Sequence, residues 1–225
     1  MIKNLGGRNR ENERFSYAIQ KVLSAFKEEF PEGNIERKII QTDYVEGAKG
    51  FENFNKLLEA CKNQQPISFV HYSYSKRLFS TAIVHPIRLK EFDNKWYLIG
   101  YSERHEALRT FGLDRIYEPS LLKRKYISTP AEEVEHYCTD IYGVYPIENQ
   151  VKQEITFLTS IDFTNYFEAY PIHKSQKAEK NNSGSSFFTI NVVPSMELIR
   201  LFRSYGRHLE VINPDWLRQQ TKSLK

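Results

Sequence analysis

The chain has 225 residues with 40% hydrophobic, 14% aromatic and 27% charged side chains, and its formal net charge is +4. A composition with 15 Phe and 14 Tyr excludes a disordered or low-complexity chain, and no apolar run reaches the roughly 18 residues needed to cross a bilayer. The first residues lack the apolar region of a signal peptide, and the two cysteines form no CxxC motif. We therefore predict a cytoplasmic globular protein without a disulfide framework or a structural zinc site.

The charge is unevenly distributed along the chain. Residues 66–127 carry 11 basic and 6 acidic side chains, whereas residues 128–150 carry 5 acidic side chains and no Lys or Arg. An excess of basic residues favours a phosphate-bearing partner, although an ordinary solvated surface produces the same balance.

The N-terminal part is predicted to be helical. Apolar residues recur at helical spacing over residues 13–29, and Pro31 and Gly33 follow as stop signals. Residues 34–50 are polar and weakly patterned. A second helix is predicted from about residue 51, ending near Asn63 and Pro66, with Cys61 on its apolar stripe, which indicates a small core residue rather than a reactive thiol.

After Pro66 the pattern changes to short β-strands. Five segments rich in β-branched and aromatic residues are separated by polar connectors, and they cover residues 67–74, 80–89, 95–102, 107–116 and 121–127. Strands of this length and spacing predict a small antiparallel barrel or a strongly bent sheet.

The C-terminal part has a different order of elements. Residues 128–150 form an acidic linker with a short helix predicted over 132–137. Beyond it the pattern predicts strands over 152–158, 170–179, 186–193 and 208–212, with helices over 161–169, from Ser195 to Gly206, and over 214–223. The order βαββαβ followed by a helix is that of a split-βαβ, ferredoxin-like domain.

Several motifs resemble the WYL domain family of bacterial transcriptional regulators. They are VHPIRLKE at 84–91, KWYLIG at 95–100 and RTFGLDRI at 109–116, the second containing the tripeptide that names the family. PIHKSQ at 171–176, SYG at 204–206 and EVI at 210–212, followed by PDWLR at 214–218, resemble the C-terminal WCX extension of that family. The resemblance covers residues 51–225.

The resemblance implies an α+β protein with a helical linker over 1–65, an SH3/Sm-like small β-barrel over 66–127, the acidic linker over 128–150 and a ferredoxin-like domain over 151–225. It implies a regulator that binds a nucleotide, another phosphate-bearing effector or single-stranded nucleic acid on the barrel, and that forms a homodimer through the C-terminal domain. The family binds duplex DNA through an N-terminal helix-turn-helix, and the first 50 residues are expected to lack one. No cofactor and no membrane partner are expected.

Arg115 and Arg109 are the main candidates for contact with phosphate. Strict alternation along a strand would place Arg109, Phe111, Leu113 and Arg115 on one face, so that two cations lie beside an aromatic ring. Such a surface suits phosphate binding and base stacking, whereas an ion pair with Asp114 would give Arg115 a structural role.

The remaining candidates are aromatic and polar. With the two arginines, the expected ligand-binding residues include Tyr72, Tyr97, Tyr101, His71 and His85. Tyr97 also fits a place at the edge of the core, and a hydrogen-bonded structural role is the default for both histidines, because no metal-ligand set surrounds them. His173, Ser175 and Gln176 are expected at a domain or dimer contact.

Enzyme motifs are missing from the sequence. It contains no GxSxG, P-loop, HExxH or GxGxxG pattern, so we expect a protein that is not an enzyme. The main alternative to an effector sensor is a module that binds single-stranded DNA or RNA directly, and a phosphate-handling enzyme is a more distant alternative.

Overall fold

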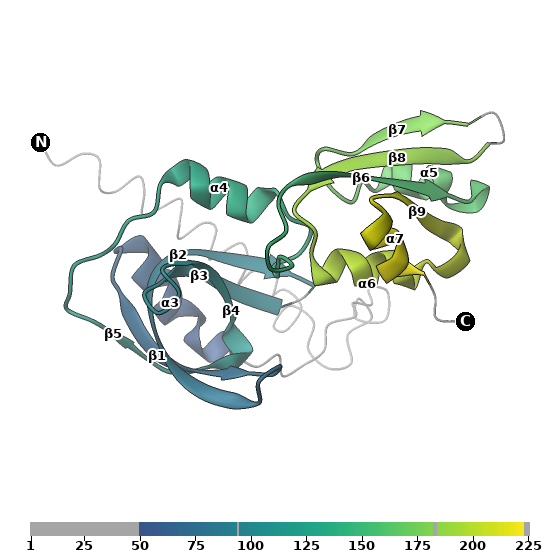
Figure 1. Cartoon of the computed structure of the whole chain (residues 1–225). Helices are drawn as coiled ribbons and strands as arrows, with labels where there is room; N and C mark the ends of the chain where they lie inside the picture. Colours follow the sequence, from purple (N-terminus) through teal and green to yellow (C-terminus); the bar gives the residue numbers. More distant parts are fainter. Residues whose placement is uncertain (1–49, 94, 182–183, 223–225) are drawn as a thin grey trace, which may run out of the picture. The chain divides into compact units, whose positions relative to one another are not determined.

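The computed structural model describes residues 50–93, 95–181 and 184–222, all of which belong to one compact unit that begins at Ala48 (Figure 1). The helix predicted over residues 13–29 lies outside the described residues. Within the described part of the chain, no helix is long and apolar enough to cross a membrane.

A five-stranded antiparallel sheet forms the first half of this unit. Its strands follow the order β4-β3-β2-β1-β5. Their bounds are β1 Ile67–Ser73, β2 Leu78–Phe92, β3 Lys95–Ser102, β4 Ala107–Gly112 and β5 Ile116–Leu121. A short 3-10 turn, η1 (Phe51–Asn53), leads into helix α3 (Phe54–Lys62).

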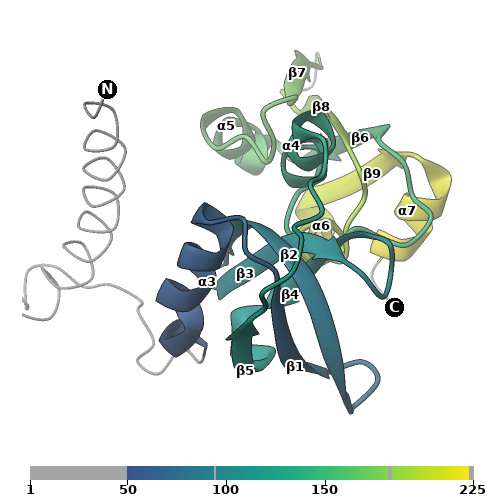
Figure 2. The ribbon, with the colours of Figure 1, turned by 90° about the vertical axis from the view of Figure 1, so that its left-hand side faces the viewer.

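Helix α3 lies against this sheet (Figure 2). Its apolar stripe buries Phe54, Leu57 and Ala60 in the same core as Ile67 and Phe69 of β1. The helix covers the sheet because burial of apolar side chains is the main force that holds a short amphipathic helix in place. The predicted helix in this region is therefore confirmed.

The sheet differs from the sequence prediction after β4. The chain leaves the extended conformation at Leu113–Arg115, which form the 3-10 turn η2, and β5 then pairs with β1. The predicted strand over 107–116 is thus two strands, and the strand predicted over 121–127 is wrong because β5 ends at Leu121. Among the described residues no pairing joins β4 to β5, so of the two predicted forms, a small barrel or a strongly bent sheet, a closed barrel is not found.

Helix α4 (Ala131–Thr139) lies within the acidic segment and confirms the short helix predicted there. Residues 140–147, called the connector here, follow it. The connector pairs with the second half of the unit through two isolated bridges, Ile141 with Val193 and Pro146 with Ser195.

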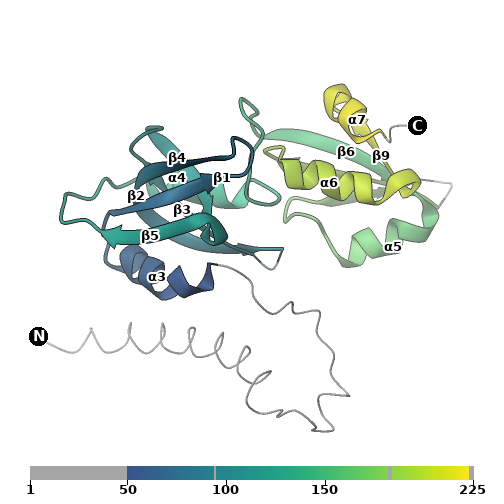
Figure 3. The ribbon, with the colours of Figure 1, turned by 90° about the horizontal axis from the view of Figure 1, so that it is seen from below.

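The second half is a four-stranded sheet with the order β7-β8-β6-β9 (Figure 1). Figure 3 shows helix α6 (Met196–Ser204) alongside strand β6 (Gln153–Thr159) of this half. Its elements are β6 Gln153–Thr159, α5 Ile161–Ala169, β7 Lys177–Lys180, β8 Ser186–Val192, α6 Met196–Ser204, η3 Gly206–His208, β9 Leu209–Asn213 and α7 Asp215–Thr221. The predicted order βαββαβ plus a helix is confirmed. The first predicted hairpin strand is shorter than expected, because only its last residues pair with β8.

The core of this half lies between the sheet and its helices. Phe167 of α5 and Phe202 of α6 pack against Phe157 of β6 and Phe188 of β8, and all four side chains are almost completely buried. Ser195 caps α6 by accepting a hydrogen bond from the Leu198 amide at 3.0 Å. The first turn of α6 is thereby fixed beside the connector.

Candidate functional site

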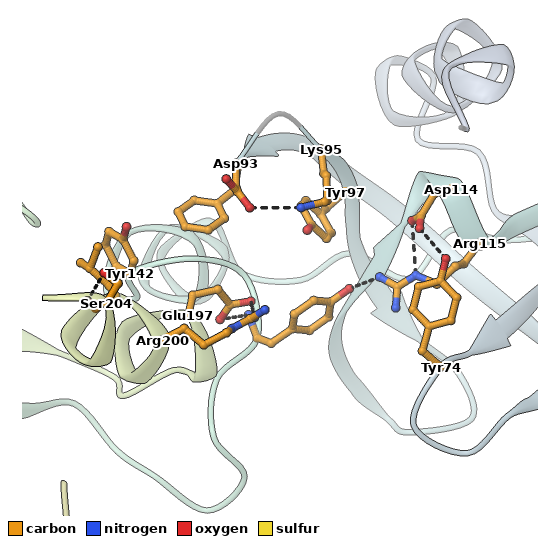
Figure 4. Close-up of a pocket in the computed structure, with 13 residues that line it drawn as sticks. Tyr74, Asp93, Lys95, Tyr97, Asp114, Arg115, Tyr142, Glu197, Arg200 and Ser204 are labelled. Atoms are coloured by element: carbon orange, nitrogen blue, oxygen red, sulfur yellow. Dashed lines mark hydrogen bonds and ion pairs between the residues drawn. The ribbon is translucent and has the colours of Figure 1, made fainter. Parts of the chain in front are cut away.

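Arg115 lies in η2 and points into a half-buried site (Figure 4). Its side chain is only 14% exposed. Nε donates a hydrogen bond to Oδ1 of Asp114 at 3.3 Å, and Nη2 donates to the hydroxyl of Tyr145. The guanidinium carbon lies 4.7 Å from the ring centroid of Tyr74 and 5.8 Å from that of Tyr145, so two aromatic rings flank the cation.

The electrostatics of the site favour a permanent cation beside neutral phenols. Burial acts to lower the pKa of Arg115, but Tyr145 and Asp114 outweigh it and the net pKa is raised. Burial raises the pKa of Tyr145 and raises that of Tyr97 to about 12. At neutral pH the site therefore presents a guanidinium and two protonated hydroxyls.

Two pockets meet at Arg115. The tyrosine-lined pocket has a volume of about 730 Å³ and is lined by Tyr74, Phe92, Asp93, Lys95, Tyr97, Asp114, Arg115, Tyr142, Tyr145, Glu197, Arg200, Leu201 and Ser204 (Figure 4). The hydroxyl-lined pocket has a volume of about 630 Å³ and is lined by His71, Ser73, Tyr74, Ser75, Thr110, Arg115, Tyr145, Met196 and Arg200. Because Arg115 and Tyr145 line both, their contact lies where the two pockets meet.

The two pockets differ in charge. The tyrosine-lined pocket contains three carboxylates and three cations, whereas the hydroxyl-lined pocket contains Arg115 and Arg200 and no carboxylate. Arg200 is 69% exposed and lies 3.7 Å from the carboxylate of Glu197. An anion is therefore favoured in the hydroxyl-lined pocket, where two guanidinium groups and several hydroxyls can face it.

The connector places Tyr145 in the site. Its amide donates to Oε2 of Glu197 at 3.4 Å, and its carbonyl accepts from the Met196 amide at 3.4 Å. Gly143 has φ +96°, and a Cβ there would lie 2.7 Å from the side chain of Glu197. Burial raises the pKa of Glu197, whose side chain is only 7% exposed. The connector thus packs tightly on the first turn of α6.

Two other predicted residues share the site with Arg115. Tyr97 is buried in β3, lines the tyrosine-lined pocket and contacts the Tyr145 ring edge-to-face at 5.7 Å. His71 of β1 lines the hydroxyl-lined pocket, and its ring meets Phe111 edge-to-face at 5.3 Å. Within the described residues the buried Nε2 of His71 has no hydrogen-bond partner, and burial lowers its pKa, which favours a neutral imidazole.

Arg109 does not share a face with Arg115. The alternation argument is wrong here because the strand ends at Gly112 and η2 redirects the chain. Arg109 is exposed, lines neither of the two pockets and donates from Nη1 to the carbonyl of Leu108 at 2.9 Å.

Tyr72, Tyr101 and His85 also lie outside the two pockets. His85 is completely buried, with Nε2 2.9 Å from Oε1 of Glu103 and Nδ1 accepting from the Ile127 amide at 2.9 Å. The Tyr101 ring lies near His85, at 6.1 Å between centroids. Tyr72 packs against Phe79 on the β1–β2 hairpin, with ring centroids 4.7 Å apart.

The polar cluster before β7 binds backbone groups. Nε2 of His173 donates to the carbonyl of Thr139 at the end of α4, at 2.6 Å. The Ser175 hydroxyl lies 2.7 Å from Nδ1 of His173, and the Gln176 amide donates to the carbonyl of Phe167 at 2.6 Å. Through Thr139, this cluster links the turn before β7 to α4.

Sequence reasoning missed Tyr145 and Arg200 as site residues. Tyr145 lies in a segment interpreted as a linker, and Arg200 lies on the polar side of a helix that is otherwise defined by its apolar face. One signal was present: residues 141–145 read Ile-Tyr-Gly-Val-Tyr, an apolar and aromatic run that is unusual in a solvated acidic linker. Within the described ranges no cluster of three His, Cys, Asp or Glu residues could hold a metal ion.

Comparison with known families gives two matches. The WYL domain family matches residues 52–121, and the WCX domain family matches residues 153–224. No curated protein matches significantly.

Two solved structures are similar to this chain. A CRISPR Cas-related protein is 15% identical with a TM-score of 0.52, over 76% of this chain and 50% of that chain, which indicates a shared fold. The Proteasome accessory factor B/C (PafBC) of Arthrobacter aurescens is 16% identical with a TM-score of 0.35, over 81% of this chain and 27% of that chain. The chain therefore spans half or less of the length of these proteins.

Proposed function

This chain is a WYL domain protein with a WCX domain on the C-terminal side, and we propose that it is the effector-sensing module of a cytoplasmic bacterial transcriptional regulator. The effector is a nucleotide, another phosphate-bearing molecule or single-stranded nucleic acid, and it binds at Arg115. The observation that carries this proposal is a half-buried guanidinium at the meeting point of two pockets, flanked by the rings of Tyr74 and Tyr145.

A phosphate group fits the hydroxyl-lined pocket. Arg115 remains charged there, and a guanidinium binds phosphate with two parallel hydrogen bonds. Arg200 supplies a second cation, while Ser73, Ser75 and Thr110 supply hydroxyls. The lack of a carboxylate in the lining of this pocket removes the main source of repulsion for an anion.

The tyrosine-lined pocket suits the organic part of such an effector. Its volume of about 730 Å³ lies within the usual range of small-molecule sites. The rings of Tyr74, Tyr97 and Tyr145 line it, and stacking of a base on an aromatic side chain contributes about 1–3 kcal/mol. Its mixed charges suit an overall neutral polar group such as a nucleoside.

The test is a binding screen with nucleotides and short 5′-phosphorylated oligonucleotides, read out by fluorescence anisotropy and thermal shift. We expect at least one ligand to stabilise the protein, and we expect Arg115→Ala to weaken its binding by at least tenfold through loss of a charge-assisted pair. Arg109→Ala is the matched control, because Arg109 is an exposed arginine of the same sheet outside both pockets. Equal binding by the Arg115→Ala variant and the wild type would rule out this site.

A second candidate function is direct binding of single-stranded DNA or RNA as the final target. The observation that favours it is a row of exposed rings on the β1–β2–β5 surface, formed by Tyr74, Phe79 and Tyr117 and linked through Tyr72, with Lys76 and Arg77 in the turn between β1 and β2. Binding of this kind would weaken steeply with salt, whereas a small effector would show a weak salt dependence. A titration at several salt concentrations separates the two functions.

We also propose that the WCX domain mediates homodimerisation. Helix α5 and the residue after it expose Ile161, Tyr166 and Tyr170 by 61%, 46% and 67%, which is an unusual amount of apolar surface for one short helix. Sedimentation velocity of the wild type and of Tyr166→Glu tests this proposal. A wild type that stays monomeric at micromolar concentration would contradict it.

A further inference from the structure

Tyr145 makes hydrogen bonds in two directions. Its hydroxyl accepts from Nη2 of Arg115, while its backbone amide and carbonyl bond to Glu197 and Met196 in the first turn of α6. Figure 4 shows Arg115 and Glu197, the two side chains to which Tyr145 forms hydrogen bonds. One residue thus connects the proposed effector site to the WCX domain.

The Arg115 nitrogen that Tyr145 holds is the one an anion needs. A guanidinium offers two edges for bidentate binding, the Nε and Nη2 edge and the Nη1 and Nη2 edge, and Nη2 belongs to both. Asp114 already accepts from Nε, and within the described residues Nη1 makes no hydrogen bond. Nη2 carries one N–H on each of these edges, so a phosphate on the edge that faces Tyr145 displaces the Tyr145 hydroxyl from Nη2.

Hydrogen bonds hold the connector on both sides of Tyr145. On the α6 side, the Ser195 hydroxyl donates to the Tyr142 carbonyl, the Val144 backbone bonds to the Glu197 carboxylate, and the Ile147 amide donates to the Pro194 carbonyl at 2.9 Å. The two Tyr145 backbone bonds are long, at 3.4 Å each. On the sheet side, Nζ of Lys90 donates to the Gly143 carbonyl at 2.7 Å. Loss of the bond to Arg115 removes the anchor that lies between these two attachment points.

We propose that Tyr145 is the residue through which occupancy of Arg115 is communicated to the first turn of α6. This inference rests on the proposed function, because it takes Arg115 as the residue that binds the effector. An anion on the Arg115 edge that faces Tyr145 releases the Tyr145 hydroxyl, and the hydrogen bonds of Tyr145 and Ile147 to residues 194–197 then open more often. The effector thereby shifts a local equilibrium at the first turn of α6.

The first test needs no ligand. Amide hydrogen exchange is measured on the full chain for Tyr145, Ile147 and Met196, in the wild type, in Arg115→Met and in Tyr145→Phe. We expect both variants to raise exchange at these amides by about tenfold, which corresponds to loss of one hydrogen bond to a charged group. Tyr145→Phe removes one oxygen atom only, so it keeps the test valid if Arg115→Met folds poorly.

The matched control is Tyr137→Phe. The Tyr137 hydroxyl lies 3.1 Å from Oγ1 of Thr110, so this variant also removes a hydroxyl that joins α4 to the sheet, but Tyr137 itself lines neither pocket. It is expected to leave exchange at residues 145, 147 and 196 unchanged. Unchanged exchange in both Arg115→Met and Tyr145→Phe would overturn the inference, and so would an equal increase in Tyr137→Phe.

The second test uses inorganic pyrophosphate as the probe. Saturating pyrophosphate is expected to raise exchange at the three amides in the wild type, and to cause no further increase in Tyr145→Phe, which still binds the probe. Binding to the wild type without any change in exchange would overturn the inference while leaving the proposed function intact. If pyrophosphate does not bind the wild type through Arg115, the proposed anion site fails for this probe. The inference about Tyr145 is then tested by hydrogen exchange of the ligand-free variants, Arg115→Met and Tyr145→Phe.

Discussion

Replacing Gly143 with alanine tests the close packing of the connector on α6. Gly143 has φ +96°, where a side chain is strained, and its Cβ would lie 2.7 Å from both Cβ and Cγ of Glu197. The backbone strain costs about 1–2 kcal/mol. The contact forces Glu197 to move and breaks its bond to the Tyr145 amide, which costs a further 1–3 kcal/mol or so. We therefore expect Gly143→Ala to lower the free energy of unfolding by about 2–5 kcal/mol.

Gly184→Ala isolates the effect of this contact from the effect of strain. Gly184 has a similar φ of +83°, but the nearest atoms to its Cβ would be those of Ile161 at 3.6 Å, an ordinary contact distance. This variant should lose only the strain energy, about 1–2 kcal/mol. Urea unfolding followed by circular dichroism measures both variants under the same conditions. Equal destabilisation by the two substitutions would refute the reasoning, because it would show that Glu197 does not restrict position 143.

Three further predictions concern buried polar groups. Lys90→Met should lower the free energy of unfolding by about 1–3 kcal/mol, because Nζ of Lys90 donates hydrogen bonds to the Gly143 and Cys138 carbonyls. Urea unfolding measures this change, and an unchanged midpoint of the urea transition would contradict the prediction. Burial lowers the pKa of His71 below 6.5, so the folded state resists its protonation, and stability should fall as the pH drops from 6.5 through the folded pKa. Unfolding curves between pH 7.5 and 5 should show a smaller fall for His71→Gln, and a fall equal to that of the wild type would exclude this cause. Burial raises the pKa of Cys61 to about 12, so native Cys61 should react with iodoacetamide at pH 8 about a thousand times more slowly than a free thiol. Mass spectrometry of the alkylated peptide measures this rate, and a rate near that of a free thiol would contradict the burial of Cys61.

Most elements of the fold could be predicted because their patterns are local. Helix α3 has a clear apolar stripe, and β6 and β8 alternate buried and partly buried residues along their length. The break at Leu113–Arg115 could not be predicted in this way. The segment reads as a continuous strand, and it breaks because Ile116 pairs with His71 of β1, a contact made across 45 residues of sequence.

Strand β7 shows the opposite case. Its four residues, Lys177–Lys180, are all exposed and carry no apolar pattern, so nothing local marks where the strand begins. The segment is extended because it pairs with β8 at the edge of the sheet. Residues before it form a turn instead, in which Gln176 accepts a hydrogen bond from the Ile172 amide at 2.9 Å.

The candidate site was only partly predictable for the same reason. Arg115 and Tyr97 stand out within motifs, and their residue types indicate a cation beside an aromatic ring. Tyr145 and Arg200 carry no such local signal, because tertiary contacts bring the connector and α6 to Arg115. The alternation argument for Arg109 failed at the point where long-range pairing ended the strand.

The attachment of Lys90 to the Gly143 carbonyl has a consequence for how far any movement can spread. Gly143 stays tied to β2 whatever happens at Arg115, while Pro146 is paired with Ser195 one residue before α6 begins. The chain between these two fixed points is only two residues long. A change at Tyr145 can therefore rotate the start of α6. Two residues between the attachment points are too few to allow one domain to move away from the other.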